Sequence, residues 1–68
     1  MSADRVTRLF ESAVGDHGHR SVELWLAYIR CEHARRNFVR AGQLHWRAVK
    51  QLAPELQAAF VEQYNAIK

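Results

Sequence analysis

The scarcity of residues that interrupt helices is the feature that most restricts the fold of this chain. Its 68 residues include one proline and three glycines, and the helix formers Ala, Leu, Arg, Glu and Gln predominate. No stretch alternates apolar and polar residues as a half-buried strand would. We therefore predict an all-α fold of about four antiparallel helices, over residues 4–14, 21–35, 39–52 and 54–67.

Residues at the expected helix ends agree with this division. Gly15 suits a left-handed helix end, and Ser21 is a good N-cap for the second helix. Pro54 fits the first turn of the fourth helix, where Glu55 lies at the positive end of the helix dipole.

Composition excludes several classes of protein. Hydrophobic residues make up 49% of the chain and charged residues 25%, which is ordinary for a small globular domain. The single cysteine cannot form an internal disulfide, so we expect an intracellular protein. No apolar run is long enough to span a membrane, and the charged N-terminus is not a signal peptide. The net charge of +3 permits a nucleic-acid partner without requiring one.

The predicted helices differ in how much of their surface is apolar. In helices 21–35 and 39–52 the polar strip is narrow, which predicts burial on more than one side. The second of these strips consists of Arg40, Gln43, Arg47, Lys50 and Gln51. Helix 54–67 instead has a single apolar stripe, typical of a capping helix, formed by Leu56, Ala59, Phe60, Tyr64 and Ile67.

An internal repeat links the two halves of the chain. A shift of 35 residues places Arg5 on Arg40, Leu9 on Leu44, Ala13 on Ala48, Val14 on Val49, Trp25 on Phe60 and Leu26 on Val61. One offset that serves two separate helices is typical of stacked helix pairs, each of which buries its face on the next.

The residues of the central pair resemble the HAT (half-a-tetratricopeptide) repeat family. Trp25, Tyr28 and Glu32 match its W-x-x-Y-x-x-x-E motif, and the second helix is similar to the family pattern at Leu44, Trp46, Arg47 and Ala48. Gly42 and His45 depart from that pattern. The resemblance implies that residues 1–68 are a single HAT-repeat fragment at the end of an α-solenoid. Helix 4–14 would be the second helix of one repeat, 21–52 a full pair, and 54–67 a capping helix.

The resemblance also implies a function. HAT-repeat proteins that are similar over residues 42–48 are scaffolds of nucleolar ribonucleoproteins. We therefore expect a non-catalytic protein–protein scaffold in the nucleolus that acts in pre-rRNA processing and small ribosomal subunit biogenesis within the small-subunit processome. Its partners would be other protein subunits of a pre-ribosomal particle. Direct RNA binding and homodimerisation, the latter through Leu9, Phe10 and Val14, are the alternatives.

Glu32 is the most informative polar residue, because it falls inside a predicted buried arc. A buried carboxylate needs a partner. Arg35 and Arg36 follow three and four residues later, and Arg47 could reach across from the facing helix. We expect Arg47 to be the partner. The alternative is a ligand-binding acid. Trp25, Tyr28 and Trp46 also fall inside the apolar arcs, so we interpret them as core residues rather than a platform for stacking bases.

Five further residues are candidates for contact with a partner protein or RNA: Arg35, Arg36, Arg40, Gln43 and Lys50. A basic stripe can hold phosphates, recruit an acidic protein segment, or simply be a solvated helix face. Arg40 and Lys50 are the stronger candidates, whereas we expect Arg47 to be structural.

Patterns of catalysis or metal binding do not stand out. No Ser-His-Asp, HExxH, GxGxxG or phosphate-loop pattern is present. Cys31 and His33 are two residues apart on a predicted helix and cannot share a zinc ion, and His17 and His19 lack a third ligand. We expect no enzyme activity, no metal site and no cofactor.

Overall fold

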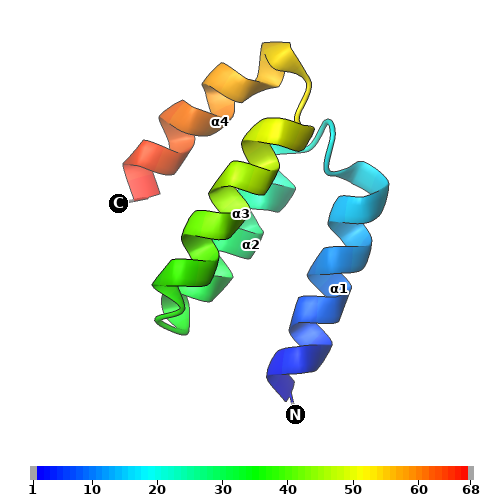
Figure 1. Ribbon diagram of the computed structural model, residues 1–68, viewed down its shortest axis with the longest axis vertical. Helices are drawn as coiled ribbons and strands as arrows, with labels where there is room; N and C mark the ends of the chain where they lie inside the picture. The colour runs from blue at the N-terminus through cyan, green and yellow to red at the C-terminus, as the bar shows by residue number, and fades with distance from the viewer. Residues whose placement is uncertain (1, 68) are drawn as a thin grey trace.

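Four helices that alternate in direction make up the fold, as the sequence predicts. The computed structural model describes residues 2–67, with side chains from residue 5 onward. The helices are α1 (Ser2–His17), α2 (Val22–Ala34), α3 (Phe38–Gln51) and α4 (Pro54–Ile67), and no strand occurs within these residues. Each helix runs back in the direction opposite to its predecessor, and α2 lies behind α3 in the view of Figure 1.

Helix α2 is the centre of the molecule. It packs against α1, α3 and α4, and α4 also packs against α3. The prediction that α2 is buried on more than one side is confirmed, because its buried residues are Trp25, Leu26, Tyr28, Ile29 and Glu32. The rest of the core comes from the helices around it, through Val14, Ala41, Leu44, Ala48, Leu52 and Phe60.

Helix α3 does not follow the same prediction. Ala41, Leu44 and Ala48 are buried, but Val39 is 79% exposed and Trp46 is 64% exposed. The interpretation of Trp46 as a core residue is therefore wrong. Trp46 lies on the outer side of α3, where its ring contacts that of its neighbour His45 edge-on.

Helix α4 has the single apolar stripe that the sequence predicts. Phe60 is buried, and Leu56, Tyr64 and Ile67 are half-buried against the core. Ala59, placed in the stripe by the sequence, is exposed. The first turn of α4 contains Pro54 and Glu55, also as predicted.

The expected N-cap of α2 is confirmed, whereas the expected end of α1 is wrong. The Ser21 hydroxyl accepts a hydrogen bond from the Leu24 backbone N–H at 3.2 Å. Gly15, however, lies inside α1, which continues to His17. The glycine that shapes this region is Gly18, where an added Cβ would lie 2.4 Å from the Val14 carbonyl oxygen.

The left-handed residue of the described chain is Arg36, with φ of 62°. The Arg36 N–H donates to the His33 carbonyl at 2.9 Å and the Asn37 N–H donates to the Glu32 carbonyl at 2.9 Å. This pair of bonds is the Schellman ending of a helix, in which glycine usually occupies the left-handed position. An arginine in this conformation costs about 1–2 kcal/mol.

Three hydrogen bonds join the loops at one end of the helices. The Trp25 indole N–H donates to the Gly18 carbonyl at 2.7 Å, which fixes the α1–α2 loop on the central helix. The Gln51 amide donates to the Val14 carbonyl at 3.0 Å, and the Ala53 N–H donates to the His19 carbonyl at 2.9 Å. The α3–α4 turn is thereby held against the end of α1.

Candidate functional site

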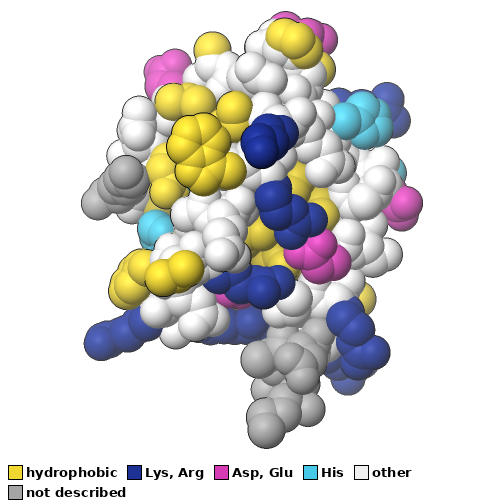
Figure 2. Space-filling model, viewed as in Figure 1, with side chains coloured by type: hydrophobic (Ala, Val, Ile, Leu, Met, Phe, Trp, Pro, Cys, Tyr) yellow, Lys and Arg dark blue, Asp and Glu magenta, His cyan; other side chains and the backbone are white. Residues whose placement is uncertain are grey.

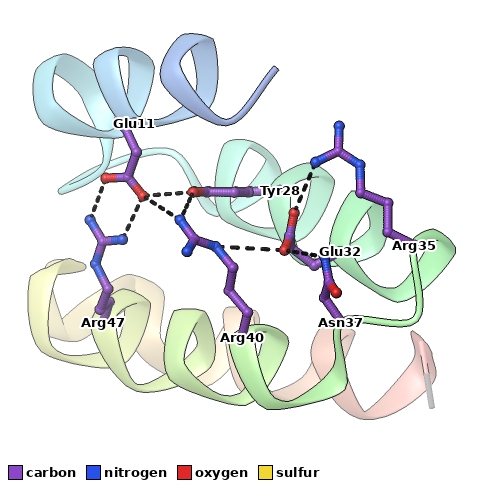
Figure 3. Close-up of polar contacts among 7 residues, drawn as sticks. All are labelled: Glu11, Tyr28, Glu32, Arg35, Asn37, Arg40 and Arg47. Carbon is purple, nitrogen blue, oxygen red and sulfur yellow. Dashed lines mark hydrogen bonds and ion pairs between the residues drawn. The ribbon is translucent and has the colours of Figure 1, made fainter. Parts of the chain in front are cut away.

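A polar network lies where α1, α2 and α3 meet. Figure 3 shows a carboxylate from α1, a tyrosine and a carboxylate from α2, an arginine and an asparagine from the turn after α2, and two arginines from α3. These residues are Glu11, Tyr28, Glu32, Arg35, Asn37, Arg40 and Arg47. The network is the largest concentration of charged contacts among the described residues.

Glu11 is the acceptor that ties α1 to the rest of the network. Both of its oxygens accept from the Arg47 guanidinium, at 2.7 and 2.8 Å, in the paired geometry that gives arginine–carboxylate contacts their strength. The Tyr28 hydroxyl donates to Glu11 Oε2 at 2.6 Å, and Arg40 Nη2 lies 3.8 Å from the same oxygen.

These contacts change the pKa of the Glu11 carboxyl. The hydrogen bond from Arg47 is the main cause that lowers the pKa of Glu11 from 4.5 to about 2, and the bond from Tyr28 lowers it further against the opposing effect of burial. Glu11 is therefore ionised at neutral pH. The same hydrogen bond raises the pKa of Arg47 above its ordinary value.

Glu32 is paired differently from the sequence-based expectation. Arg47 is bound to Glu11, and Glu32 instead faces Arg35 at 3.4 Å, Arg40 at 3.6 Å and the Asn37 side-chain amide at 3.2 Å. Glu32 is 1% exposed, as predicted. The expectation failed because Arg40 lies about two helical turns before Arg47 on α3 and is the arginine closer to Glu32 along the helix.

Tyr28 connects the two carboxylates. Its ring is buried and stacks on Phe10 with the ring centres 4.8 Å apart, while Arg40 Nη2 donates to its hydroxyl at 3.2 Å. Burial is the main cause that raises the pKa of Tyr28, and the bond to Glu11 adds to it. The hydroxyl therefore stays protonated and donates to Glu11.

The network connects helices α1, α2 and α3 through ion pairs and hydrogen bonds. Two carboxylates face three guanidiniums, so each acidic side chain has at least one cationic partner. Every buried side-chain nitrogen or oxygen within the described residues has a hydrogen-bond partner. The network fixes the position of α1 and α3 on α2 and leaves little capacity to bind a further charged group.

The predicted basic stripe is divided by these contacts. Arg35, Arg40 and Arg47 belong to the network, whereas the side chains of Arg36 and Lys50 make no ion pair or hydrogen bond with other described residues. Gln43 is exposed. Arg47 forms an ion pair between helices, as a structural residue would, and Arg40 does so too.

The outer face of α3 carries the remaining candidates. We define it as Val39, Gln43, Trp46 and Lys50, which follow one another at intervals of four, three and four residues and therefore form one straight row along the helix. All four are exposed. Figure 2 shows hydrophobic side chains on this side of the molecule next to a row of Lys and Arg side chains.

The surface expected to support homodimerisation is mostly covered. Leu9 is 65% exposed, but Phe10 is half-buried on Tyr28 and Val14 is buried against the core. Phe10 packs on Tyr28 of α2 and Val14 belongs to the core, so the expectation that all three residues form an exposed apolar patch is wrong.

Two features are absent from the described residues, a metal-binding cluster and a helix that could span a membrane. No three His, Cys, Asp or Glu side chains among them gather where a metal ion could bind. None of the helices they form is both long enough and apolar enough to cross a membrane.

Comparisons with known proteins found no relative of this chain. The chain matches no family model, no curated protein and no solved structure.

Sequence reasoning missed Glu11, which turned out to be the hub of the network. Its partners lie 17 and 36 residues away, so no local spacing reveals them. The available signal was weak: Glu11 stands between Phe10 and Val14, two residues of the apolar side of its helix. A carboxylate at that border is well placed to reach a neighbouring helix.

Proposed function

We propose that this chain is a non-catalytic scaffold module, the end of a HAT-type α-solenoid, that holds proteins together in a ribonucleoprotein. The supporting observation is the position of Trp25, Tyr28 and Glu32, the three residues that match the family motif. Trp25 fixes the α1–α2 loop, Tyr28 joins α1 to α3, and Glu32 joins the end of α2 to the start of α3. All three side chains are used to fasten helices to one another.

The order of contacts also supports stacked pairs. The central helix packs on the helix before it, its own partner and the helix after it. This is the pattern expected when each helix pair buries its face on the next. The charged side chains that could act in catalysis instead form ion pairs between helices.

The cellular role proposed here follows from the resemblance alone. Residues 42–48 are similar to the C-terminal part of the HAT-repeat subunit of the U-three small nucleolar ribonucleoprotein. We accordingly propose a role in pre-rRNA processing and small ribosomal subunit biogenesis in the nucleolus, within the small-subunit processome, with other pre-ribosomal proteins as partners.

Affinity purification from nuclear extract tests this role. The tagged chain is recovered with and without RNase, beside a Trp25→Ala variant as a control for binding that does not need the fold. We expect pre-ribosomal proteins with the wild type under both conditions and their loss with Trp25→Ala. Recovery of no pre-ribosomal protein would refute the role.

Direct RNA binding is the second candidate, favoured by the exposure of Trp46 beside unpaired cations. An exposed indole can stack on a base, and Arg36 and Lys50 are free to contact phosphates. RNA binding predicts that purification becomes sensitive to RNase. It also predicts that the affinity for a single-stranded oligonucleotide falls several-fold between 50 and 200 mM salt, because log affinity falls against log salt with a slope of about −0.7 for each phosphate contacted.

A further inference from the structure

The outer face of α3 combines exposed apolar side chains with unpaired positive charge. Val39 is 79% exposed and Trp46 is 64% exposed, and of the other large hydrophobic residues in the described chain only Leu9 and Phe38 exceed half exposure. They are separated by seven residues, which is two turns of a helix, with Gln43 between them and Lys50 one turn further. Along this row the apolar side chains Val39 and Trp46 alternate with the polar side chains Gln43 and Lys50, a mixture that can pack against another amphipathic helix.

The charge of this face is one-sided. The sequence of α3 contains no Asp or Glu, and Lys50 at one end of the row has no carboxylate partner among the described residues. Arg36 precedes the other end, also without a partner, beside a shallow hollow of about 420 Å³. The two free cations therefore lie at opposite ends of the apolar row, about 20 Å apart along the helix.

We propose that the outer face of α3 binds an amphipathic helix of a partner protein, whose apolar side packs on Val39 and Trp46 and whose acidic residues, near both of its ends, pair with Arg36 and Lys50. The inference deepens the proposed scaffold function and rests on it. A second copy of this chain is a poor occupant, because two α3 faces brought together would oppose like charges. RNA is also a poorer occupant, because the free cations lie far apart and the Glu11 carboxylate stands between the two central arginines.

The conformation of Arg36 is consistent with this role. Glycine would relieve the left-handed backbone at this position, yet the residue is an arginine whose side chain has no partner in the described chain. Strain of this kind tends to be kept where the side chain has a task. Arg36→Gly is expected to raise Tm by roughly 4–8 °C and at the same time to weaken binding of the partner helix.

A displayed library of 18-residue helices provides the test. One side of each helix varies among Leu, Ala and Ser, and the positions near both ends vary among Glu, Lys and Gln. Selection against the full chain is expected to enrich helices with leucine on one side and glutamate near both ends. Their affinity should fall at least about tenfold with Trp46→Ala, as for a central aromatic residue of an interface. It should fall about two- to fivefold with Lys50→Gln or Arg36→Gln, as for exposed ion pairs.

Matched control variants distinguish binding at the outer face of α3 from non-specific binding. Leu9→Ala removes an equally exposed apolar side chain from α1, and Arg30→Gln removes an exposed cation from α2, so both should leave the affinity unchanged. Enrichment of basic or uncharged helices, no enrichment at all, or affinity that is indifferent to Trp46→Ala would each overturn the proposal. So would tighter binding of a 12-nucleotide single-stranded RNA than of any selected helix, or a dimer of the chain that Trp46→Ala dissociates.

The two proposals fail in different ways. Selected acidic helices that depend on Trp46, together with a purification that yields no pre-ribosomal protein, would leave the binding face in place and remove the ribonucleoprotein role. The opposite result would keep the scaffold role and remove α3 as the binding face.

Discussion

Helices α2 and α3 look alike in sequence and behave differently in the fold. Both have a narrow polar strip, and both were expected to be buried on more than one side. Helix α2 has a neighbour on three sides and buries its aromatic residues, whereas α3 leaves Val39 and Trp46 exposed. An apolar arc therefore indicates only that a face can be covered. Which face is covered depends on how many helices surround it.

The first prediction compares the two tryptophans directly. Trp25 is 0% exposed and hydrogen-bonded, so Trp25→Ala should cost about 3–5 kcal/mol of unfolding free energy, enough to unfold much of a domain this small. Trp46→Ala should change it by no more than about 0.5 kcal/mol. Urea denaturation followed by circular dichroism measures both, and equal losses would contradict the distinction between the helices.

The second prediction concerns the carboxylate that joins α2 to the start of α3. Glu32→Ala removes a buried acceptor from Arg35, Asn37 and Arg40 and should cost about 2 kcal/mol. The cost stays below that of a fully buried pair because both arginines keep partial contact with water. Glu62→Ala, on an exposed site of α4, is the control and should have little effect. A Glu32→Ala protein as stable as this control would show that the pairing contributes nothing.

The third prediction compares Gly18, in the turn between α1 and α2, with Gly42, inside α3. Gly18 accepts from Trp25 and has no room for a Cβ, so Gly18→Ala should destabilise the fold by about 1–2 kcal/mol. Gly42 lies inside α3 with nothing within 4 Å of an added Cβ, so Gly42→Ala should stabilise it by about 0.5–1 kcal/mol. Thermal unfolding should give shifts of opposite sign, and a destabilising Gly42→Ala would mean that the open side of α3 is in fact occupied.

The fourth and smallest effect is the ionic tie between α1 and α3. Because folding lowers the pKa of Glu11 from 4.5 to about 2, the ionised Glu11 stabilises the folded state above about pH 4.5, and this stabilisation is lost as the pH falls toward 2. Its side chain is 35% exposed, so solvent screening limits the effect to about 1 kcal/mol.

Glu11→Gln isolates this contribution from that of the other acids. The stability difference between the wild type and Glu11→Gln should be largest near neutral pH and should close as the pH falls below 4.5. A difference that stays constant from pH 7 to pH 2 would show that the charge of Glu11 is not its source.

Local patterns were sufficient to predict most of the fold. Scarce helix breakers, the Ser21 cap and Pro54 located four helices, and the apolar arc of α2 identified Trp25, Tyr28 and Glu32 as buried. The left-handed position was misassigned to Gly15, because the expected signal for it is glycine and Arg36 occupies it instead.

The pairing within the polar network could not be predicted from the sequence, for a different reason. The sequence indicated that Glu32 needs a cationic partner and offered Arg35, Arg36 and Arg47, whereas Glu32 pairs with Arg35 and with Arg40, which the packing of α3 places beside it. Glu11 and Arg47 are 36 residues apart, and their contact depends on the placement of α1, which no short pattern encodes. The exposure of Trp46 depends on the same missing information.

Acrylamide quenching of tryptophan fluorescence in a Trp46→Phe variant tests the contrast between α2 and α3 most directly. The wild type contains Trp25 and Trp46, so the variant reports on Trp25 alone and the difference reports on Trp46. We predict that the substitution removes a red-shifted, readily quenched component and leaves a blue-shifted emission that acrylamide barely reaches. Remaining fluorescence that is quenched as readily as the lost component would contradict the account, because the two helices would then be equally open to solvent.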